Sequence, residues 1–198
     1  MKVVVIFGTA VLLTAGMLAA GSLSAPPAAD SYQVDPVHSS MVFRIKHASA
    51  ANFYGRFNSI TGSFTLDDDA AKCNFQIQIK TDSVDTGQKK RDDHLKSPDF
   101  FNAAQFPTMS FKSTQVKKSG ADGYDVTGDL TLHGETKSVT AKVTKTGSGK
   151  NFGKAVVGVE AILTIKRTDF GVGKTFGPEV LGDEVQITLG LEGAAGKP

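Results

Sequence analysis

Hydrophobic and polar residues alternate along most of the chain after residue 38. In the segment 39–47, Met41, Phe43 and Ile45 fall on one side, and polar residues such as Lys46 fall on the other. A period of two residues is the pattern of a β-strand with one buried face. This segment therefore predicts a strand whose apolar side faces the interior of the protein.

The same pattern recurs at regular spacing, with glycine-bearing turns between the runs. Further alternating segments are residues 53–57, 60–66, 73–80, 109–112, 124–132, 139–143, 156–165 and 185–191. About eight strands longer than five residues, without alternating helices, predict an all-β sandwich or closed barrel. We favour an eight-stranded antiparallel, lipocalin-like barrel. Eight strands can close around one ligand, and glycines inside strands, such as Gly55 and Gly128, relieve a curling sheet.

The connection between residues 91 and 107 departs from this pattern. Phe100, Phe101 and Phe106 lie within seven residues, which is a heavy apolar load for a polar connection. Ser97 followed by Pro98 resembles a helix N-cap with a first-turn proline, so we expect one short helix here. Two alternatives stay open: the phenylalanines line a cavity, or they plug a packed core.

The N-terminal residues have the features of an export signal. Lys2 is the only charged residue before Asp30, and residues 3–20 are apolar. We expect a signal peptide over residues 1–24, cut near Ser24, and therefore a periplasmic protein. A membrane anchor over residues 3–23 is the competing interpretation. After the signal we expect a flexible segment (25–31), one domain (32–192) and a flexible tail (193–198).

Cysteine content and charge narrow the class of protein further. Cys73 is the only cysteine, so an internal disulfide is excluded and stability must come from a core. The formal net charge of +2 is close to balance. A nucleic-acid partner is disfavoured, because a phosphate-binding face needs an excess of clustered cations.

The residues that could carry chemistry form no recognisable catalytic or metal motif. The four histidines lack the spacing of a zinc site, and no serine lies in a nucleophile elbow. Cys73 lies on the apolar side of its segment, where a thiol is inert packing. We therefore expect no enzyme, no metal and no cofactor. Thirteen phenylalanines and no tryptophan remain, and an interior lined with phenylalanine selects an apolar ligand by size and dryness.

Several stretches resemble successive blocks of the YceI-like family of bacterial periplasmic proteins. The stretches are DPVHSSMVFRIKH, FYGRF, GSFTLD, TDSVDTGQKKRDDHLKSPDFFNAAQFP, VTGDLTLHGETKSV, RTDFGVG and LGDEVQITLGLEG. The resemblance covers about residues 32–192. It implies a lipocalin-like barrel whose hydrophobic lumen holds a polyisoprenoid chain or a similar lipid such as a polyprenyl quinone. Asn102 departs from the family, whose members often carry Asp there, and this weakens any role for a carboxylate at that position.

Two groups of residues are our candidates for ligand contact. The proposed lumen residues are Met41, Phe43, Ile45, Phe57, Phe64, Phe75, Ile77, Phe100, Phe101, Phe111 and Phe170. The candidates for contact with a polar head group are His38, Lys46, Arg91 and His94, since a cation or a histidine suits a pyrophosphate or a quinone carbonyl. For Arg91 the alternative is a salt bridge to Asp92, Asp93 or Asp99 that only fixes the loop.

Three functions are carried forward. The leading one is a carrier for an isoprenoid lipid or polyprenyl quinone, without a stable membrane anchor. The second is a small periplasmic enzyme that acts on a lipid inside the barrel. The third is a stress-related interaction protein with a packed core and no ligand. The edge strands and the phenylalanine-rich connection are also compatible with a homodimer.

Overall fold

The computed structural model describes Met1 and residues 30–195. The predicted signal peptide and most of the predicted flexible N-terminal segment lie outside the described residues, as do residues 196–198. Among the described residues, no helix has the length and hydrophobicity needed to cross a bilayer.

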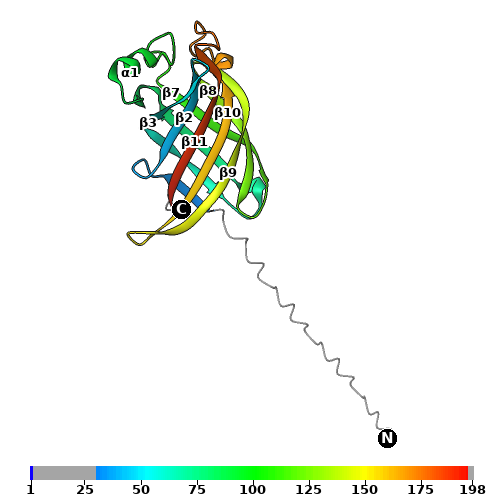
Figure 1. Cartoon of the computed structure of the whole chain (residues 1–198). Helices are drawn as coiled ribbons and strands as arrows, with labels where there is room; N and C mark the ends of the chain where they lie inside the picture. The colour runs from blue at the N-terminus through cyan, green and yellow to red at the C-terminus, as the bar shows by residue number, and fades with distance from the viewer. Residues whose placement is uncertain (2–29, 196–198) are drawn as a thin grey trace.

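The described chain folds into antiparallel strands joined by short turns (Figure 1). The strands are β1 Asp30–Val34, β2 Ser40–His47, β3 Ala51–Phe57, β4 Ile60–Leu66, β5 Asn74–Lys80, β6 Val84–Asp85, β7 Thr108–Lys118, β8 Gly123–Leu132, β9 Glu135–Asn151, β10 Lys154–Lys166 and β11 Leu181–Ala195. The helices are α1 Lys89–Leu95 and the 3-10 turns η1 Ala70–Lys72, η2 Thr81–Ser83 and η3 Arg167–Phe170.

These strands close into a barrel with eight positions. β1 and β2 both pair with β11 and together occupy one position. β4 pairs with β1 and β3 pairs with β2, so these two strands occupy the next position. β5 pairs with β4 and β6 pairs with β3, so they share the third position. Three broken strands and the five continuous strands β7–β11 give the eight positions, and pairing of β1 with β11 closes the ring. The predicted eight-stranded antiparallel barrel is therefore confirmed.

The breaks in the first three strands have local causes. Pro36 has no N–H to offer a neighbouring strand, and the chain turns outward between β1 and β2. Residues 58–59 separate β3 from β4, and η2 separates β5 from β6. At the α1 end of the barrel, β3 is the only described strand that pairs with β6. The connection that contains α1 lies between β6 and β7.

Alternating residues of each strand face the interior, as the sequence pattern predicts. On β2, Met41 and Ile45 are buried, while Val42 and Lys46 are exposed. The buried apolar residues form one cluster that extends from strand to strand around the barrel. Cys73 belongs to this cluster, and burial raises the pKa of its thiol above the usual value, which keeps the sulfur unreactive.

Phenylalanine rings lie against glycines of a neighbouring strand at two places in the barrel wall. The Phe43 ring covers Gly55, where an added Cβ would come within 2.3 Å of Cζ. The Phe111 ring covers Gly128 in the same way, with a corresponding approach of 2.5 Å. Gly55 and Gly128 therefore provide space for rings. Gly62 has a different role, because its φ of +141° is a backbone conformation that other residues rarely adopt.

The single short helix predicted in the 91–107 connection is present as α1, but it begins at Lys89, earlier than the cap predicted at Ser97. α1 begins after Gln88, whose side-chain oxygen accepts a hydrogen bond from Arg91 N at 2.7 Å. Ser97 lies beyond the end of α1 and forms a turn, in which its carbonyl accepts hydrogen bonds from Phe100 N and Asn102 N. Asn102 has a φ of +46°, a left-handed conformation that asparagine tolerates better than most residues.

The last strand is longer than the sequence indicates. Residues 193–195, expected to be a flexible tail, belong to β11 and pair with β1 on one side. Pairing with β10 reaches Ala194 on the other side. The expectation of a loose end is therefore wrong for these three residues, because they complete the closure of the barrel.

Candidate functional site

The interior of the barrel contains two adjoining apolar chambers. The upper chamber, at the α1 end, has a volume of about 450 Å³. The lower chamber, deeper in the barrel, has a volume of about 80 Å³. Both are lined by Met41, Met109, Leu132, Ile165 and Ile187, so these five residues form the boundary between the chambers. A ligand pocket in a protein occupies about 300 to 1,000 Å³, and the upper chamber falls within this range.

Two groups of aromatic rings in mutual contact line the upper chamber. The Phe43 and Phe57 centroids are 5.8 Å apart, and Phe57 makes an edge-to-face contact with Phe101 at 5.2 Å. Phe100 stacks on Phe176 at 5.2 Å. These contacts join β2 and β3 to two covering segments, residues 86–107 and residues 171–180, which together we call the lid.

A buried arginine holds the second half of the lid. Arg167, in η3, is 3% exposed. Its guanidinium donates hydrogen bonds to five backbone carbonyls, which belong to Val172, Gly173, Phe176, Leu181 and Gly182. Every donor of this side chain is thus used to shape the segment from 172 to 182.

The charge of Arg167 is balanced by a nearby carboxylate. Burial lowers the pKa of Arg167, and the charge of Asp183 raises it. Burial acts to raise the pKa of Asp183, but hydrogen bonds from Thr168 and the charge of Arg167 outweigh it and leave the pKa below its usual value. Thr168 donates to the same carboxylate oxygen from its hydroxyl at 2.7 Å and from its backbone N–H at 3.1 Å. Arg167 is accordingly a structural cation, with its donors engaged inside the protein.

Arg91 in α1 is the cation that remains beside the chamber. Its Nε and Nη2 atoms donate to the side chain and carbonyl of Thr86 at 2.7 and 2.8 Å, and its guanidinium lies 4.5 Å from the Phe53 ring centroid. The neighbouring acids have other partners: Lys89 contacts Asp93 at 2.6 Å, and Asp92 accepts from Thr86. Arg91 makes no salt bridge within the described residues, so the alternative of a loop-fixing salt bridge is wrong.

His94, one turn later on α1, joins polar and aromatic contacts. Its Nε2 lies 3.1 Å from Asp99 Oδ2, and its ring meets the edges of Phe100 and Phe176 at 5.1 and 6.3 Å. His47, at the end of β2, also lines the chamber. Apart from Arg167, whose donors are engaged by backbone carbonyls, the charged or imidazole side chains that line the upper chamber among the described residues are thus Arg91, His94 and His47.

Most of the residues proposed from the sequence lie along the two chambers. Those in the upper chamber are Met41, Phe43, Ile45, Phe57, Phe100, Phe101, Arg91 and His94. Those in the lower chamber are Met41, Phe75, Ile77 and Phe111.

Four of the proposed residues do not line either chamber. Phe64 is buried beneath Tyr32 and Phe75, and Phe170 is buried in η3. Lys46 is exposed on β2, and His38 lies beyond the opposite end of that strand. The structure does not bring these four side chains to the lumen.

Sequence reasoning missed part of the lining. Phe53 lines the upper chamber from β3 and follows the alternation of that strand, so it was within reach of the pattern. Phe176 and Val180 lie in residues 171–180, where no alternation signals their orientation. Met109 and Leu132 were recognised as inward-facing strand residues, but their place at the boundary between the chambers depends on the barrel as a whole.

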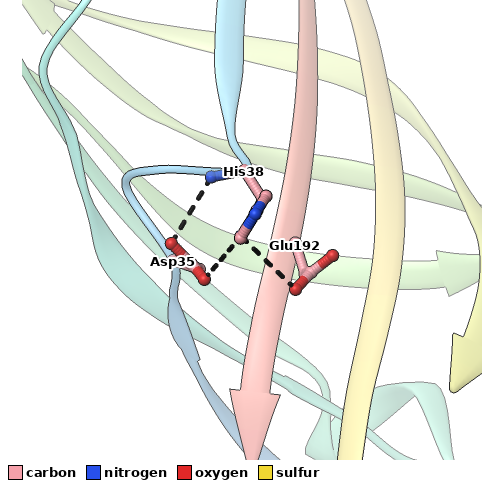
Figure 2. A group of neighbouring side chains, drawn as sticks. All are labelled: Asp35, His38 and Glu192. Carbon is pink, nitrogen blue, oxygen red and sulfur yellow. Dashed lines mark hydrogen bonds and ion pairs between the residues drawn. The ribbon is translucent and has the colours of Figure 1, made fainter. Parts of the chain in front are cut away.

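Asp35, His38 and Glu192 form a separate cluster at the break between β1 and β2. Figure 2 shows the His38 ring between the two carboxylates, with Nδ1 2.9 Å from Asp35 Oδ2 and 3.8 Å from Glu192 Oε1. These are residue types that ligate metals, and their donor atoms lie within 4.8 Å of one another. Asp35 also accepts a hydrogen bond from Val37 N at 2.8 Å. This is the geometry of a turn fastened to β11, and we assign the cluster that structural role.

The comparisons with known proteins place the chain in a family. The family model of the YceI-like domain matches residues 32–193. The chain belongs to the YceI-like family. A UPF0312 protein of Yersinia pestis is 44% identical to this YceI-like chain over 153 residues, covering 75% of this chain and 77% of that protein. A UPF0312 protein of Pseudomonas paraeruginosa is 43% identical over 141 residues, covering 69% and 73%.

Solved structures share the YceI-like barrel. BcnA of Burkholderia cenocepacia is 30% identical with a TM-score of 0.73, covering 80% of this chain and 98% of that one. The YCEI protein of Campylobacter jejuni is 28% identical with a TM-score of 0.70, covering 77% and 90%. A polyisoprenoid-binding domain from Saccharophagus degradans is 18% identical with a TM-score of 0.62, covering 83% and 98%, and here the similarity extends to the fold alone.

Proposed function

We propose that this YceI-like protein binds the apolar tail of an isoprenoid lipid or polyprenyl quinone in its barrel and carries it through the periplasm. The upper chamber is the observation that carries the proposal: about 450 Å³ of space lined by phenylalanine, aliphatic side chains and methionine. An apolar space of this size favours a ligand with a long apolar part.

The polar residues at the α1 end suit the head group of such a lipid. The Arg91 guanidinium lies over the Phe53 ring and makes no salt bridge within the described chain. His94 and His47 line the same end of the chamber. A guanidinium beside imidazoles can donate hydrogen bonds to a phosphate or to a quinone carbonyl, while the tail extends toward the lower chamber.

Binding, rather than catalysis, is the activity we infer. The polar groups that line the upper chamber are two imidazoles and two guanidinium groups, and Arg167 is fully engaged by backbone carbonyls. No Asp or Glu side chain lines either chamber in the described part of the chain. The His94 imidazole is paired with Asp99 at 3.1 Å.

A periplasmic location follows from the N-terminal sequence in this proposal. Residues 3–20 are apolar, Lys2 is the only charge before Asp30, and small residues surround Ser24. A carrier in this compartment would keep a water-insoluble tail out of the aqueous phase between membranes. The solved polyisoprenoid-binding domain with the same fold is consistent with this role.

The test is mass spectrometry of an organic extract from the protein purified out of the periplasm, beside an intact-mass spectrum that identifies the mature N-terminus. A stoichiometric polyprenyl lipid or quinone supports the proposal and names the ligand. An empty extract, together with no uptake of such lipids by the folded protein, would contradict it and return the phenylalanines to the role of packed core.

A matched pair of variants ties the ligand to the chamber. Phe43→Arg places a charge in the upper chamber, because Phe43 lines it, and should abolish uptake. Val42→Arg introduces the same side chain at the next residue of β2, where the side chain is exposed, and should leave uptake unchanged. Equal uptake by both folded variants would exclude the upper chamber as the site.

A further inference from the structure

The hairpin between β9 and β10 extends beyond the barrel at the end opposite α1 (Figure 1). Pairing of β9 with β8 ends at Thr144 opposite Gly123, whereas pairing of β9 with β10 continues to Asn151 opposite Lys154. Because β10 pairs with β11 up to Val156 opposite Ala194, only residues 150–155 form a two-stranded extension beyond the barrel wall. Residues 150–155 include no buried side chain, so this extension contributes nothing to the core of the barrel.

The turn at the tip carries a fully exposed phenylalanine in an unfavourable backbone conformation. Phe152 and Gly153 form a two-residue loop with φ values of +47° and +80°. Turns of this kind prefer asparagine or aspartate before the glycine, and a bulky residue with positive φ is an outlier. The Phe152 ring is 101% exposed. Burial of the ring therefore does not offset the free-energy cost of the positive φ at Phe152.

The charge around this ring is of one sign. Lys150 and Lys154 flank the turn, and Lys145 lies farther back on β9. Residues 136–159 contain five lysines and no Asp or Glu. The ion pair of Asp125 with Lys142, at 2.7 Å, lies on the β8-paired part of β9. Beyond residue 145 the hairpin presents only positive charge.

We propose that this tip docks the protein on the surface of an anionic lipid bilayer, with the Phe152 ring in the interface and the lysines beside the phosphates. An aromatic ring gains free energy in the interfacial region, and basic residues nearby are attracted to anionic lipids. The chain also enters the barrel at this end, since Tyr32 of β1 pairs with Ala195 and Val156 pairs with Ala194.

Docking and ligand binding occupy opposite ends of the barrel. Residues of α1 line the upper chamber, and the β9–β10 hairpin lies at the end of the barrel opposite α1 (Figure 1). A protein docked through the tip would keep its lid in the aqueous phase, available to a soluble partner. The proposal therefore does not rest on the carrier function, and a change at the tip should leave the affinity of the chamber for its ligand unchanged.

The test uses the absence of tryptophan from the sequence. In the exported full-length gene product, Phe152→Trp supplies a single fluorophore at the tip, and Tyr54→Trp supplies one on the exposed outer wall of β3. Vesicles of about three parts phosphatidylcholine to one part phosphatidylglycerol should shift the emission of Phe152→Trp to shorter wavelength, and brominated lipid should quench it. The Tyr54→Trp probe should show neither effect.

Further variants test the part played by charge. Replacing Lys150 and Lys154 by Gln should weaken vesicle binding of the Phe152→Trp protein at least tenfold, and added salt should weaken it further. No shift at residue 152, or equal shifts at residues 152 and 54, would overturn the proposal. A shift that depends on protein concentration without lipid would assign the tip to a second copy of the chain and would also overturn it.

Discussion

The volume of the lumen predicts how much of an isoprenoid tail the protein can bury. An apolar cavity of about 150 Å³ accommodates benzene, so the upper chamber of about 450 Å³ accommodates roughly 18 carbon atoms. The lower chamber of about 80 Å³ adds roughly three more. The lumen is therefore full at about four isoprene units of five carbons each.

Affinity should rise with tail length only until this limit is reached. At about 0.3 kcal/mol for each ligand atom, a five-carbon unit contributes about 1.5 kcal/mol, or roughly a tenfold decrease in Kd. From two to four units we expect about this gain at every step. Beyond four units we expect changes below about twofold, because added carbons remain outside the lumen.

The assay is displacement of a fluorescent isoprenoid by alcohols of two to eight isoprene units with the same head group. Ala161→Leu adds three carbons to the wall of the lower chamber and should move the plateau to a shorter tail. Ala71→Leu makes the same change on an exposed residue of η1 and should not move it. A steady gain up to eight units, or no dependence on length from two units upward, would refute the volume argument.

Three further predictions concern individual residues. Arg167→Met leaves five buried carbonyls without their donor and should lower the free energy of unfolding by about 3 kcal/mol in a denaturant titration, and a loss below about 1 kcal/mol would contradict the clamp. Gly55→Ala should push the Phe43 ring into the chamber and weaken binding of the longest tails, and unchanged binding in a folded variant would show that the ring can move elsewhere. The hydrogen bond from His38 to Asp35 raises the pKa of His38 above about 6.5 and lowers that of Asp35. The stability that the raised pKa contributes is thus present below about pH 6.5 and is lost as the pH rises through the folded-state pKa. Proton NMR titration should show the raised value and its return toward about 6.5 in Asp35→Asn, and an identical titration in both proteins would contradict the pairing.

The strands could be predicted from the sequence because the signal is local. Alternation along β2 or β5 reports which side chains share a face, and the number of strands together with the glycines inside them favours a barrel over a sandwich. Local alternation does not report volume. Whether Phe43 and Phe75 fill a core or line a chamber depends on how all the aromatic side chains pack inside the barrel. The sequence pattern left both alternatives open.

The errors in the candidate site have the same origin. His38 and His47 flank one strand, and only the direction of β2 within the barrel determines which of them is near the lid. The segment 171–180 lacks periodicity, so its part in the lid had no signal. The capping pattern at Ser97 is a real local preference, but the helix forms earlier, where Gln88 caps it.

The glycines behind the phenylalanine rings affect the shape of the lumen, although they do not line it. Gly55 and Gly128 do not line either chamber, yet each sets how deeply a phenylalanine is recessed into the wall. A homologue could carry the same lining residues and differ only by a methyl group behind one ring, and it would then hold a shorter tail. Under the proposed function, ligand preference is therefore encoded partly in the wall behind the lining, and substituting those glycines offers a means of retuning the lumen without replacing any residue that lines it.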